Sequence, residues 1–348
     1  MGVTQRLDQF QQRHSPVGFP LAVAYKFVDD QGVYLAALMT YYGFLSLFPL
    51  LLLLASALGF ALRNDEHLRQ QILDSTLSQF PVIGEQVRDP SGLQGSRVAI
   101  VIGALTAIYG ALGVAQALQH AMNTAWSVPR NRRPNVLKAR ARSVLILLTA
   151  GVAVLTTTTL SILAGTAGAR HGVFSSPTAI LTTIAAVAAN IVIFGAVFRI
   201  ATARRLSFSD NAPGAVLAAI VWQTMQVFGT AYVSHAVKDR TATYGVFALV
   251  LGLLAWTFLV AVGVVFSVEV NVVRSRQLYP RSLLTPFTDD VDLTQADQDT
   301  YRNAATAQQH KGFEQVDVSF DHDGHNATEL RRQRHAHELN DSDEMKSP

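Results

Sequence analysis

The chain has 348 residues, of which 49% are apolar and only 15% are charged, a balance typical of membrane proteins rather than soluble domains. Because the sequence contains no cysteine, it excludes disulfides, thiolate metal sites and cysteine nucleophiles. Residues 1–281 hold 22 Lys and Arg against 11 Asp and Glu, whereas residues 282–348 hold 6 against 14. The basic residues border apolar runs, so lipid headgroups explain them better than nucleic acid, which we do not expect as a partner.

Residues 1–33 lack a cleavable signal sequence, so the first apolar span is expected to serve as the targeting signal. Leu21, Tyr25 and Val28 recur at helical spacing in this segment. We therefore predict a cytoplasmic N-terminal segment with an amphipathic helix that lies on the membrane surface.

Residues 34–62 carry no charge and form the first predicted membrane span. The segment exceeds the roughly 20 residues that a bilayer core requires, so it must tilt or kink. Pro49 is the expected structural kink, and the carbonyl that it frees needs a neighbouring helix, water or a hydroxyl such as Ser46. This requirement favours a helix bundle over a single anchor.

Five further apolar runs follow, which gives an all-α polytopic membrane protein with six transmembrane helices. The predicted spans are about 34–62, 98–126, 144–169, 178–198, 215–237 and 244–273. Small residues let neighbouring helices approach closely, and we assign this structural role to Gly110, Gly113 and Gly245.

The positive charges predict the orientation of the six spans. The side that holds both termini collects 15 Lys and Arg, and the opposite side collects 7. Positive residues concentrate on the cytoplasmic side of membrane proteins, so both termini are expected in the cytoplasm. The densest cluster contains Arg130, Arg132 and Arg133, which we expect to contact anionic lipid headgroups.

Residues 277–348 are predicted to form a disordered, acidic cytoplasmic tail, because they hold too few aliphatic residues to offset the entropy of ordering. The motif at Asp321–His325 can bind a metal weakly. Its spacing matches no closed site, however, and a solvated polar tail is the favoured interpretation. No metal or cofactor is predicted.

Polar residues inside the apolar runs, Ser46 among them, are the candidate binding or transport residues. Glu269 is the one acidic residue well inside a span, and Asn271 lies beside it. A carboxylate there must face protein, water or a basic partner. Pairing with an arginine such as Arg142 or Arg199 and a role in binding or proton coupling both remain open.

The second and fifth spans hold further polar residues. Gln116, His120 and Asn123 share one helix face, and Gln223 lies in the fifth span. Hydrogen bonding between helices explains them better than a transport pathway, although both stay open. Tyr41 and Tyr42 lie deep in the first span, where bulky packing is the simpler explanation and binding the alternative.

Three segments together resemble the YihY/BrkB family of bacterial inner-membrane proteins. They are AALMTYYGFLSLFPLLLLL at Ala36–Leu54, NTAWSVPRNRR at Asn123–Arg133 and TYGVFALVLGLLAWTFLVAVGVVFSVEVN at Thr243–Asn271. The resemblance covers about residues 15–280 and implies six helices with cytoplasmic termini in the bacterial inner membrane.

The family's links to virulence and to export of envelope lipids imply a transporter or flippase of an amphiphilic envelope molecule. A membrane scaffold that recruits partners through its basic loop and acidic tail is the alternative. Some relatives carry a label as a tRNA-processing ribonuclease. This chain has no clustered ligand set for two metal ions, so we expect it not to be an enzyme.

Overall fold

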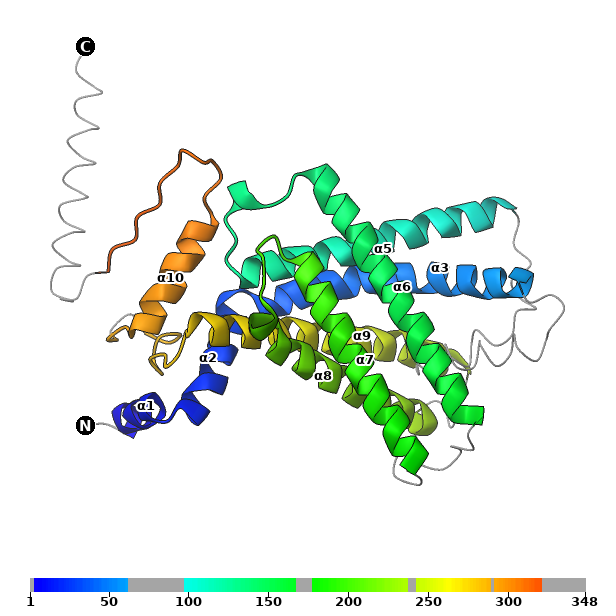
Figure 1. The fold of residues 1–348 in the computed structure, drawn as a ribbon, viewed down its shortest axis with the longest axis horizontal. Helices are drawn as coiled ribbons and strands as arrows, with labels where there is room; N and C mark the ends of the chain where they lie inside the picture. Colours follow the sequence, from blue (N-terminus) through cyan, green and yellow to red (C-terminus); the bar gives the residue numbers. More distant parts are fainter. Residues whose placement is uncertain (1–2, 62–96, 167–176, 237–241, 289–290, 321–348) are drawn as a thin grey trace, which may run out of the picture. The chain divides into compact units, whose positions relative to one another are not determined.

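The computed structural model describes residues 3–61, 97–166, 177–236, 242–288 and 291–320, and this part of the chain contains helices and no strands (Figure 1). Two short helices come first, α1 (Val3–Arg13) and α2 (Ser15–Asp29). The long helices are α3 (Gly32–Ala61), α5 (Arg97–Ala125), α6 (Val136–Thr166), α7 (Pro177–Ala201), α8 (Phe208–Ala236) and α9 (Ala242–Arg276). The 3-10 turn η2 (Arg130–Arg132) precedes α6, and α10 (Gln295–Ala307) is the last helix.

The chain divides into two compact units. The larger unit comprises residues 23–128 and 132–276 and contains the six long helices. The smaller unit comprises residues 1–22, 129–131 and 277–348. Each unit is described separately below.

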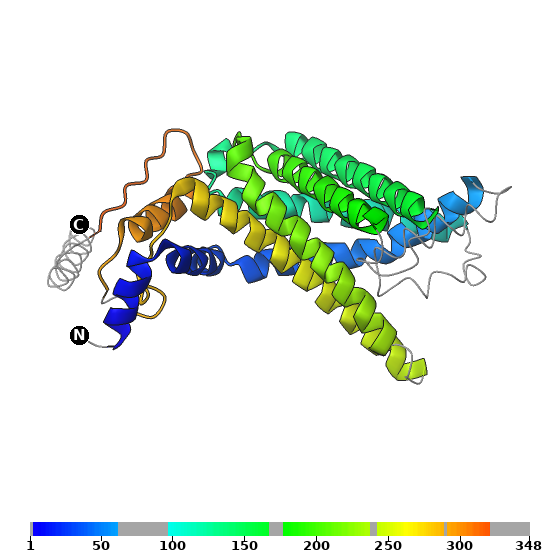
Figure 2. The same ribbon diagram turned by 60° about the horizontal axis from the view of Figure 1, so that its bottom comes forward.

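The six long helices of the larger unit coincide with the six predicted apolar segments. α3 packs against α5 and α9, α6 against α7, and α7 against α8. Figure 2 shows α8 and α9 side by side, which agrees with their extensive contact. The prediction of an all-helical bundle is therefore confirmed for the described residues.

Local sequence signals position the helix ends. The Asn135 side chain accepts a hydrogen bond from the N–H of Lys138 (3.0 Å) and caps α6. Ser207 and Asp210 form a reciprocal capping pair at the start of α8. α5 ends at Ala125, and Ser127 just beyond it has a left-handed φ of 46°. The Val128 N–H donates to the Asn123 carbonyl, as in a Schellman motif.

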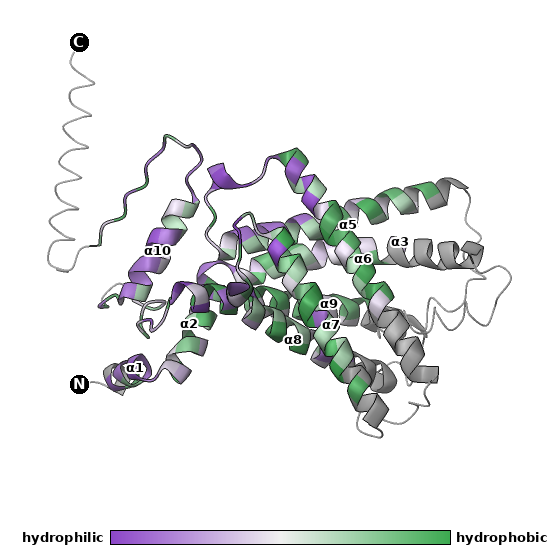
Figure 3. Cartoon of the chain, in the orientation of Figure 1, coloured by the Kyte–Doolittle hydropathy of each residue, from purple (hydrophilic) through white to green (hydrophobic). Residues whose placement is uncertain are grey.

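Three stretches in the described residues are long and apolar enough to cross a membrane: Val136–Thr156, Ile184–Ala201 and Val250–Arg276. Gly32–Leu47 is a shorter apolar helix. Hydrophobic residues predominate along the coloured parts of the long helices, whereas α1 and α10 are largely hydrophilic (Figure 3). The chain is therefore a membrane protein with several spans, and the full count of six stays a prediction.

The surface of the larger unit supports the same conclusion. Large apolar side chains stand exposed on the long helices, including Leu105, Leu148, Leu155, Ile184 and Val192, each at least 60% exposed. Many exposed apolar side chains of this kind are unfavourable in water and are typical of helices that contact hydrocarbon.

Two glycines let α3 and α5 approach closely. A Cβ added at Gly110 would lie 2.6 Å from the Ser46 Cβ and 2.9 Å from its backbone nitrogen. At Gly113 it would overlap the Tyr42 ring. Both predicted structural glycines therefore lie at a helix contact. The side-chain surroundings of Gly245 in α9 lie outside the described residues, so its assignment stays a prediction.

Pro49 lies inside α3, which continues as one helix on both sides of it. The buried Ser46 hydroxyl donates to the Gly43 carbonyl of its own helix (3.0 Å). Ser46 therefore combines a satisfied hydroxyl with the close contact to Gly110.

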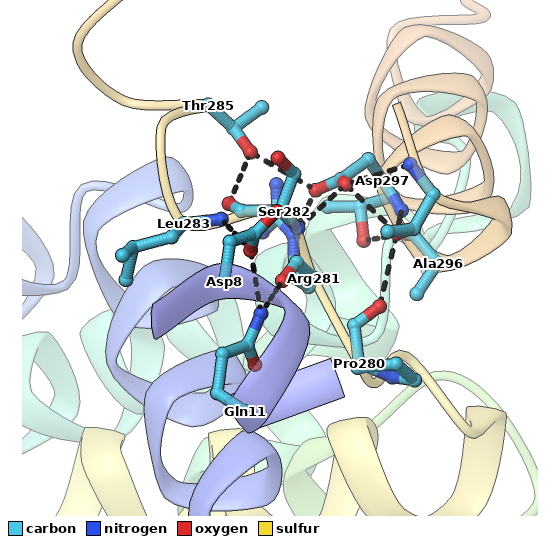
Figure 4. Close-up of polar contacts among 11 residues, drawn as sticks. Asp8, Gln11, Pro280, Arg281, Ser282, Leu283, Thr285, Ala296 and Asp297 are labelled. Carbon is cyan, nitrogen blue, oxygen red and sulfur yellow. Dashed lines mark hydrogen bonds and ion pairs between the residues drawn. The ribbon is translucent and has the colours of Figure 1, made fainter. Parts of the chain in front are cut away.

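The smaller unit is organised around a buried ion pair between Arg281 and Asp297, whose side chains are 1% and 0% exposed (Figure 4). The Asp297 carboxylate accepts from Arg281 Nε (2.7 Å) and the Ser282 N–H (2.9 Å). It also accepts from the N–H and hydroxyl of Thr294, which caps α10. Each carboxylate oxygen thus has partners, as a buried charge requires.

The same network includes α1. The Asp8 carboxylate accepts from the Leu283 N–H (2.8 Å), and the Gln11 side-chain amide donates to the Arg281 carbonyl. We call this set of contacts between α1, residues 281–285 and the start of α10 the terminal clasp (Figure 4).

The prediction of disorder from residue 277 onward is wrong for the part of the tail in the clasp. Residues 295–307 form the capped helix α10, and the surrounding segment carries buried hydrogen bonds. Composition did not reveal this order because the stabilising contacts are polar and specific: some join residues 281–297 to one another, and others come from α1, far away in the sequence. Residues 321–348, with the possible metal motif, lie outside the described residues.

We expect Gly110→Ala to lower the stability of the bundle. The added methyl group would collide with Ser46, and overpacking of this kind costs roughly 1–3 kcal/mol. The matched control is Gly151→Ala in α6, where nothing lies within 4 Å of the added Cβ. Unfolding of the purified protein in detergent micelles, followed by denaturant titration, measures both. Equal stability of the two variants would contradict the α3–α5 contact.

We expect Asp297→Ala to open the terminal clasp, because it removes the acceptor for Arg281, Ser282 and Thr294. Amide hydrogen exchange in residues 277–288 and 295–307 of the full chain should accelerate at least tenfold. Asp299→Ala is the control, since Asp299 lies on the same helix with its side chain 40% exposed. Unchanged exchange in Asp297→Ala would argue against the clasp.

Candidate functional site: a buried ionic cluster at the basic end of the bundle

One end of the larger unit brings together α3, α6 and α8 at their starts and α5, α7 and α9 at their ends. The Arg142 guanidinium donates to the Thr202 carbonyl (3.3 Å), and the Asn123 side chain accepts from the Ala203 N–H (2.9 Å). We call this the basic end. Its basic residues are Lys26, Arg132, Arg133, Lys138, Arg140, Arg142, Arg199, Arg204, Arg205, Arg274 and Arg276.

A buried ionic cluster lies at this end. Lys26, from the last turn of α2, is 2% exposed and its ammonium pairs with Asp30. The Lys26 Nζ also lies 3.8 Å from the Glu269 carboxylate of α9, which is completely buried. A third contact, from Nζ to the Ala125 carbonyl (3.3 Å), joins the cluster to the end of α5. Among the described residues, the Lys26 ammonium is thus the cation nearest to both the Asp30 and the Glu269 carboxylate.

The geometry of the cluster follows from a tight connection between α2 and α3. Gln31 has a left-handed φ of 56°, so the chain turns directly from one helix into the next. Asp30 directly precedes Gln31, and its N–H bonds the Lys26 carbonyl, so Asp30 lies one helical turn beyond Lys26. Because α3 then packs against α9, this corner lies against the last turns of α9, where Glu269 is located.

The two carboxyl groups of the cluster are direct neighbours. No donor group in the described part of the chain bonds either oxygen of Glu269. Its side-chain neighbour is the Asp30 carboxyl, so the two can share a hydrogen bond only when one of them holds a proton. Burial raises the pKa of Asp30 above its ordinary value, and the Lys26 charge opposes that shift.

This arrangement is suited to holding and releasing a proton. Two ionised carboxylates with one lysine would leave a net negative charge buried, which is costly in a low-dielectric environment. One proton shared between them removes that charge. Asp29 also contributes negative charge to the cluster.

The expected arginine partners of Glu269 are wrong. Arg142 donates to the Thr202 carbonyl, and the Arg199 guanidinium lies over the Phe208 ring, 5.0 Å from its centre. The partner is Lys26, which is 243 positions earlier in the chain and which reaches Glu269 only because α2 and α3 fold back against α9.

Asn271 has a structural contact beside the cluster. Its side-chain oxygen accepts from the Gly214 N–H of α8 (2.6 Å), while its amide nitrogen is buried without a partner in the described residues. A Cβ at Gly214 would collide with the Ser267 carbonyl and with Asn271. Asn271 therefore joins the close contact between α8 and α9.

The predicted polar face of α5 is only partly internal. Asn123 is buried and bonds the Gln119 and Ala203 backbones, whereas Gln116 and His120 are exposed. Gln119 is buried instead and donates to Ser143 (2.9 Å) and to the Ala139 carbonyl (3.1 Å). Hydrogen bonding between helices thus accounts for Asn123 and Gln119.

The remaining candidates lie apart from the ionic cluster. Tyr41 is 60% exposed and its ring packs edge-on against Tyr42, which in turn packs against Tyr109. Gln223 is half-buried in α8. No described contact joins Tyr41, Tyr42 or Gln223 to Lys26 or Glu269.

The basic residues predicted to contact lipid have mixed surroundings. Arg132 is exposed, and Arg133 Nε donates to the Val128 carbonyl (3.1 Å). Arg130, in the smaller unit, lies 3.4 Å from the His310 ring. Lipid binding by these residues stays a prediction. Among the described residues, no group of three His, Cys, Asp or Glu side chains is placed to hold a metal ion.

Sequence reasoning missed Lys26 and Asp30 as members of the site. In the sequence Lys26 contributes only to the positive charge of the N-terminal side, and no pattern assigns a role to Asp30. The available signal was a lysine and an aspartate spaced four residues apart immediately before an uncharged span. That spacing is common at helix surfaces, so it does not by itself indicate burial.

A comparison with family models adds one match. The model described as "Virulence factor BrkB" matches residues 23–289, roughly three quarters of the chain. The matched range includes every member of the ionic cluster. No curated protein matches the chain, and neither does any solved structure.

We expect Lys26→Met to destabilise the protein by roughly 3–5 kcal/mol, because it leaves two buried carboxylates without their cation. Glu269→Gln should cost less, since the Lys26–Asp30 pair remains. The double variant Lys26→Met/Glu269→Gln should recover part of the loss. Lys138→Met, at an exposed position in α6, is the control. Denaturant unfolding in detergent measures all four, and equal losses for Lys26→Met and Lys138→Met would refute the cluster.

Proposed function

The chain belongs to the virulence factor BrkB family, and from that membership we propose that it is a multi-pass bacterial inner-membrane protein. We propose further that it transports an amphiphilic envelope molecule and that this transport is linked to protons. In this proposal all six long helices cross the membrane. Both termini lie in the cytoplasm, as the excess of positive charge on that side suggests. The protein acts as a transporter and not as an enzyme.

The single observation that carries the proposal is the carboxyl pair of Asp30 and Glu269 beside Lys26. Buried ionisable groups at membrane depth are costly, and proton-driven transporters use such groups as relays. A purely structural ion pair would match one carboxylate to one cation and satisfy every oxygen. Here Glu269 has no hydrogen-bond donor in the described residues, so a proton is the missing partner.

The exposed apolar helices suit a substrate that is partly lipid-like. An amphiphile can keep its acyl chains in the bilayer while only its polar headgroup moves along the protein, so a large aqueous channel is not required. The polar side chains of the basic end would supply the headgroup path at the cytoplasmic side. The candidates are Lys26, Gln119, Asn123, Glu269 and Asn271.

We expect Glu269→Gln to remove the proton dependence of transport. The purified chain would be reconstituted in phospholipid vesicles with fluorescent short-chain phosphatidylglycerol, and dithionite quenching would report the rate of movement between leaflets. The wild-type rate should change when a pH gradient is imposed. The Glu269→Gln rate should not respond to the gradient.

Asp292→Asn is the control for this experiment, because Asp292 is exposed in the smaller unit. It should behave like the wild type. A Glu269→Gln variant that is folded and still responds fully to the pH gradient would remove the carboxyl pair from the mechanism.

The scaffold alternative makes a different prediction. A chain that ends at Phe320 keeps the terminal clasp and all described residues while it loses the acidic end of the tail. A transporter should retain its vesicle activity and its cellular function after this truncation. A scaffold that recruits partners through the tail should lose its cellular function.

A further inference from the structure

Trp126 has an unusual environment at the end of α5. Its side chain is completely buried, although it lies at the point where the helix stops. The Arg204 guanidinium lies over the indole ring, 5.5 Å from its centre, and the Arg276 guanidinium lies 6.0 Å from the same centre. Two positive charges from different parts of the larger unit therefore meet on one aromatic ring.

The donors of this group outnumber its acceptors. A terminal nitrogen of Arg276 donates to the Trp126 carbonyl. The Nε of Arg276 and the indole nitrogen of Trp126 are both buried without a hydrogen-bond partner in the described part of the chain. Arg204 is exposed, and no described ion pair links Arg204 or Arg276 to a carboxylate. Buried donors without acceptors are uncommon and call for an explanation.

The nearby carboxylates are already engaged. Asp30 influences Arg276 electrostatically, but its carboxylate pairs with Lys26. The charge of Arg204 acts on Asp210, but the Asp210 carboxylate accepts hydrogen bonds from the Ser207 and Ser275 hydroxyls (2.8 and 2.9 Å). These hydrogen bonds lower the pKa of Asp210, which stays ionised and committed to them. Neither Asp30 nor Asp210 therefore accepts the free hydrogen-bond donors of Arg204 and Arg276.

A purely structural role explains the group poorly. A cation–π contact with the ring stabilises each guanidinium, but the two guanidinium groups also repel each other. One arginine on the ring would give most of that stabilisation without the repulsion. A second arginine with free donors gains its advantage when an anion binds between them.

We propose that Arg204, Arg276 and the Trp126 indole form a binding site for a phosphate group. Arginine matches phosphate with paired hydrogen bonds, and a tryptophan beside it is typical of the headgroup region of a membrane. The phosphate is carried by an anionic lipid headgroup or is a free phosphate anion. This site adjoins the Lys26–Asp30–Glu269 cluster but shares no residue with it: Lys26 donates to the carbonyl of Ala125, next to Trp126, and Asp30 acts electrostatically on Arg276. The proposal does not depend on transport.

Calorimetric titration of the full chain in a non-ionic detergent tests the site. The probes are short-chain phosphatidic acid, inorganic phosphate and, as a zwitterionic comparison, short-chain phosphatidylcholine. The wild type should bind phosphatidic acid, and Arg204→Gln should weaken that binding at least tenfold. Arg205→Gln removes the same charge from the neighbouring exposed residue and should change the dissociation constant less than twofold.

The arms of the titration separate the sources of the phosphate. Tighter binding of phosphatidic acid than of inorganic phosphate assigns the site to a lipid headgroup. Equal binding of the two, lost in Arg204→Gln, assigns it to a free anion. Equal weakening by Arg204→Gln and Arg205→Gln would show diffuse attraction instead of a site and would overturn the proposal, as would absence of phosphate binding by the wild type.

A second variant guards against misfolding. Arg204→Lys keeps the charge but loses the paired hydrogen bonds. We therefore expect its affinity to lie between that of the wild type and that of Arg204→Gln. Full wild-type affinity in Arg204→Lys together with an unfolded Arg204→Gln would overturn the proposed geometry. Phosphate-dependent thermal stabilisation of the wild type, absent in folded Arg204→Lys, would support it.

Discussion

The ammonium of Lys26 is the interaction on which the basic end of the bundle depends. It pairs with Asp30, lies 3.8 Å from Glu269 and donates to the carbonyl that ends α5. These contacts join α2, α5 and α9, and the turn at Gln31 fixes where α3 begins. A single buried cation therefore couples helix arrangement to the charge state of two carboxyl groups, because either carboxylate without it would be an uncompensated charge.

Hydrocarbon around the bundle explains why many polar side chains lie between the helices. The outer faces of the long helices carry exposed leucine, isoleucine and valine, so polar groups must be satisfied between helices. Most of those described are satisfied. Asn123, Gln119 and Ser143 bond within the basic end, and Asn271 bonds to the backbone of α8. Buried atoms without a partner in the described residues remain on Asn211 and Asn271 and at the two charged centres, Glu269 and the Trp126 group. The last two are informative because they involve charged side chains.

The two polar centres of the larger unit have opposite electrostatic character. The Lys26 cluster has more carboxyl groups than cations and is suited to holding a proton. The Trp126 group has two cations and unfilled donors and is suited to holding an anion. The terminal clasp differs from both, because Asp297 has a donor for each oxygen and functions as a structural contact within the smaller unit.

The sequence by itself determined that the chain is a membrane protein, that it is helical and which family it belongs to. Uncharged runs of more than 20 residues allow few structures other than membrane helices, and the motifs around Ala36, Asn123 and Thr243 indicated the family that the match over residues 23–289 shows. It also singled out Glu269, since a carboxylate within an apolar run is costly wherever it points. These conclusions depend on local composition, which the sequence displays directly.

Only the tertiary structure decided the partners. Lys26 and Glu269 are 243 positions apart, and Arg281 contacts an N-terminal helix about 270 residues earlier in the chain. Local periodicity cannot show which distant side chains meet, because that depends on how helices pack and which face each one buries. For the same reason composition predicted a disordered tail where α10 forms. Helical spacing likewise grouped Gln116 with Asn123, although Gln116 is exposed and Gln119 is the buried residue.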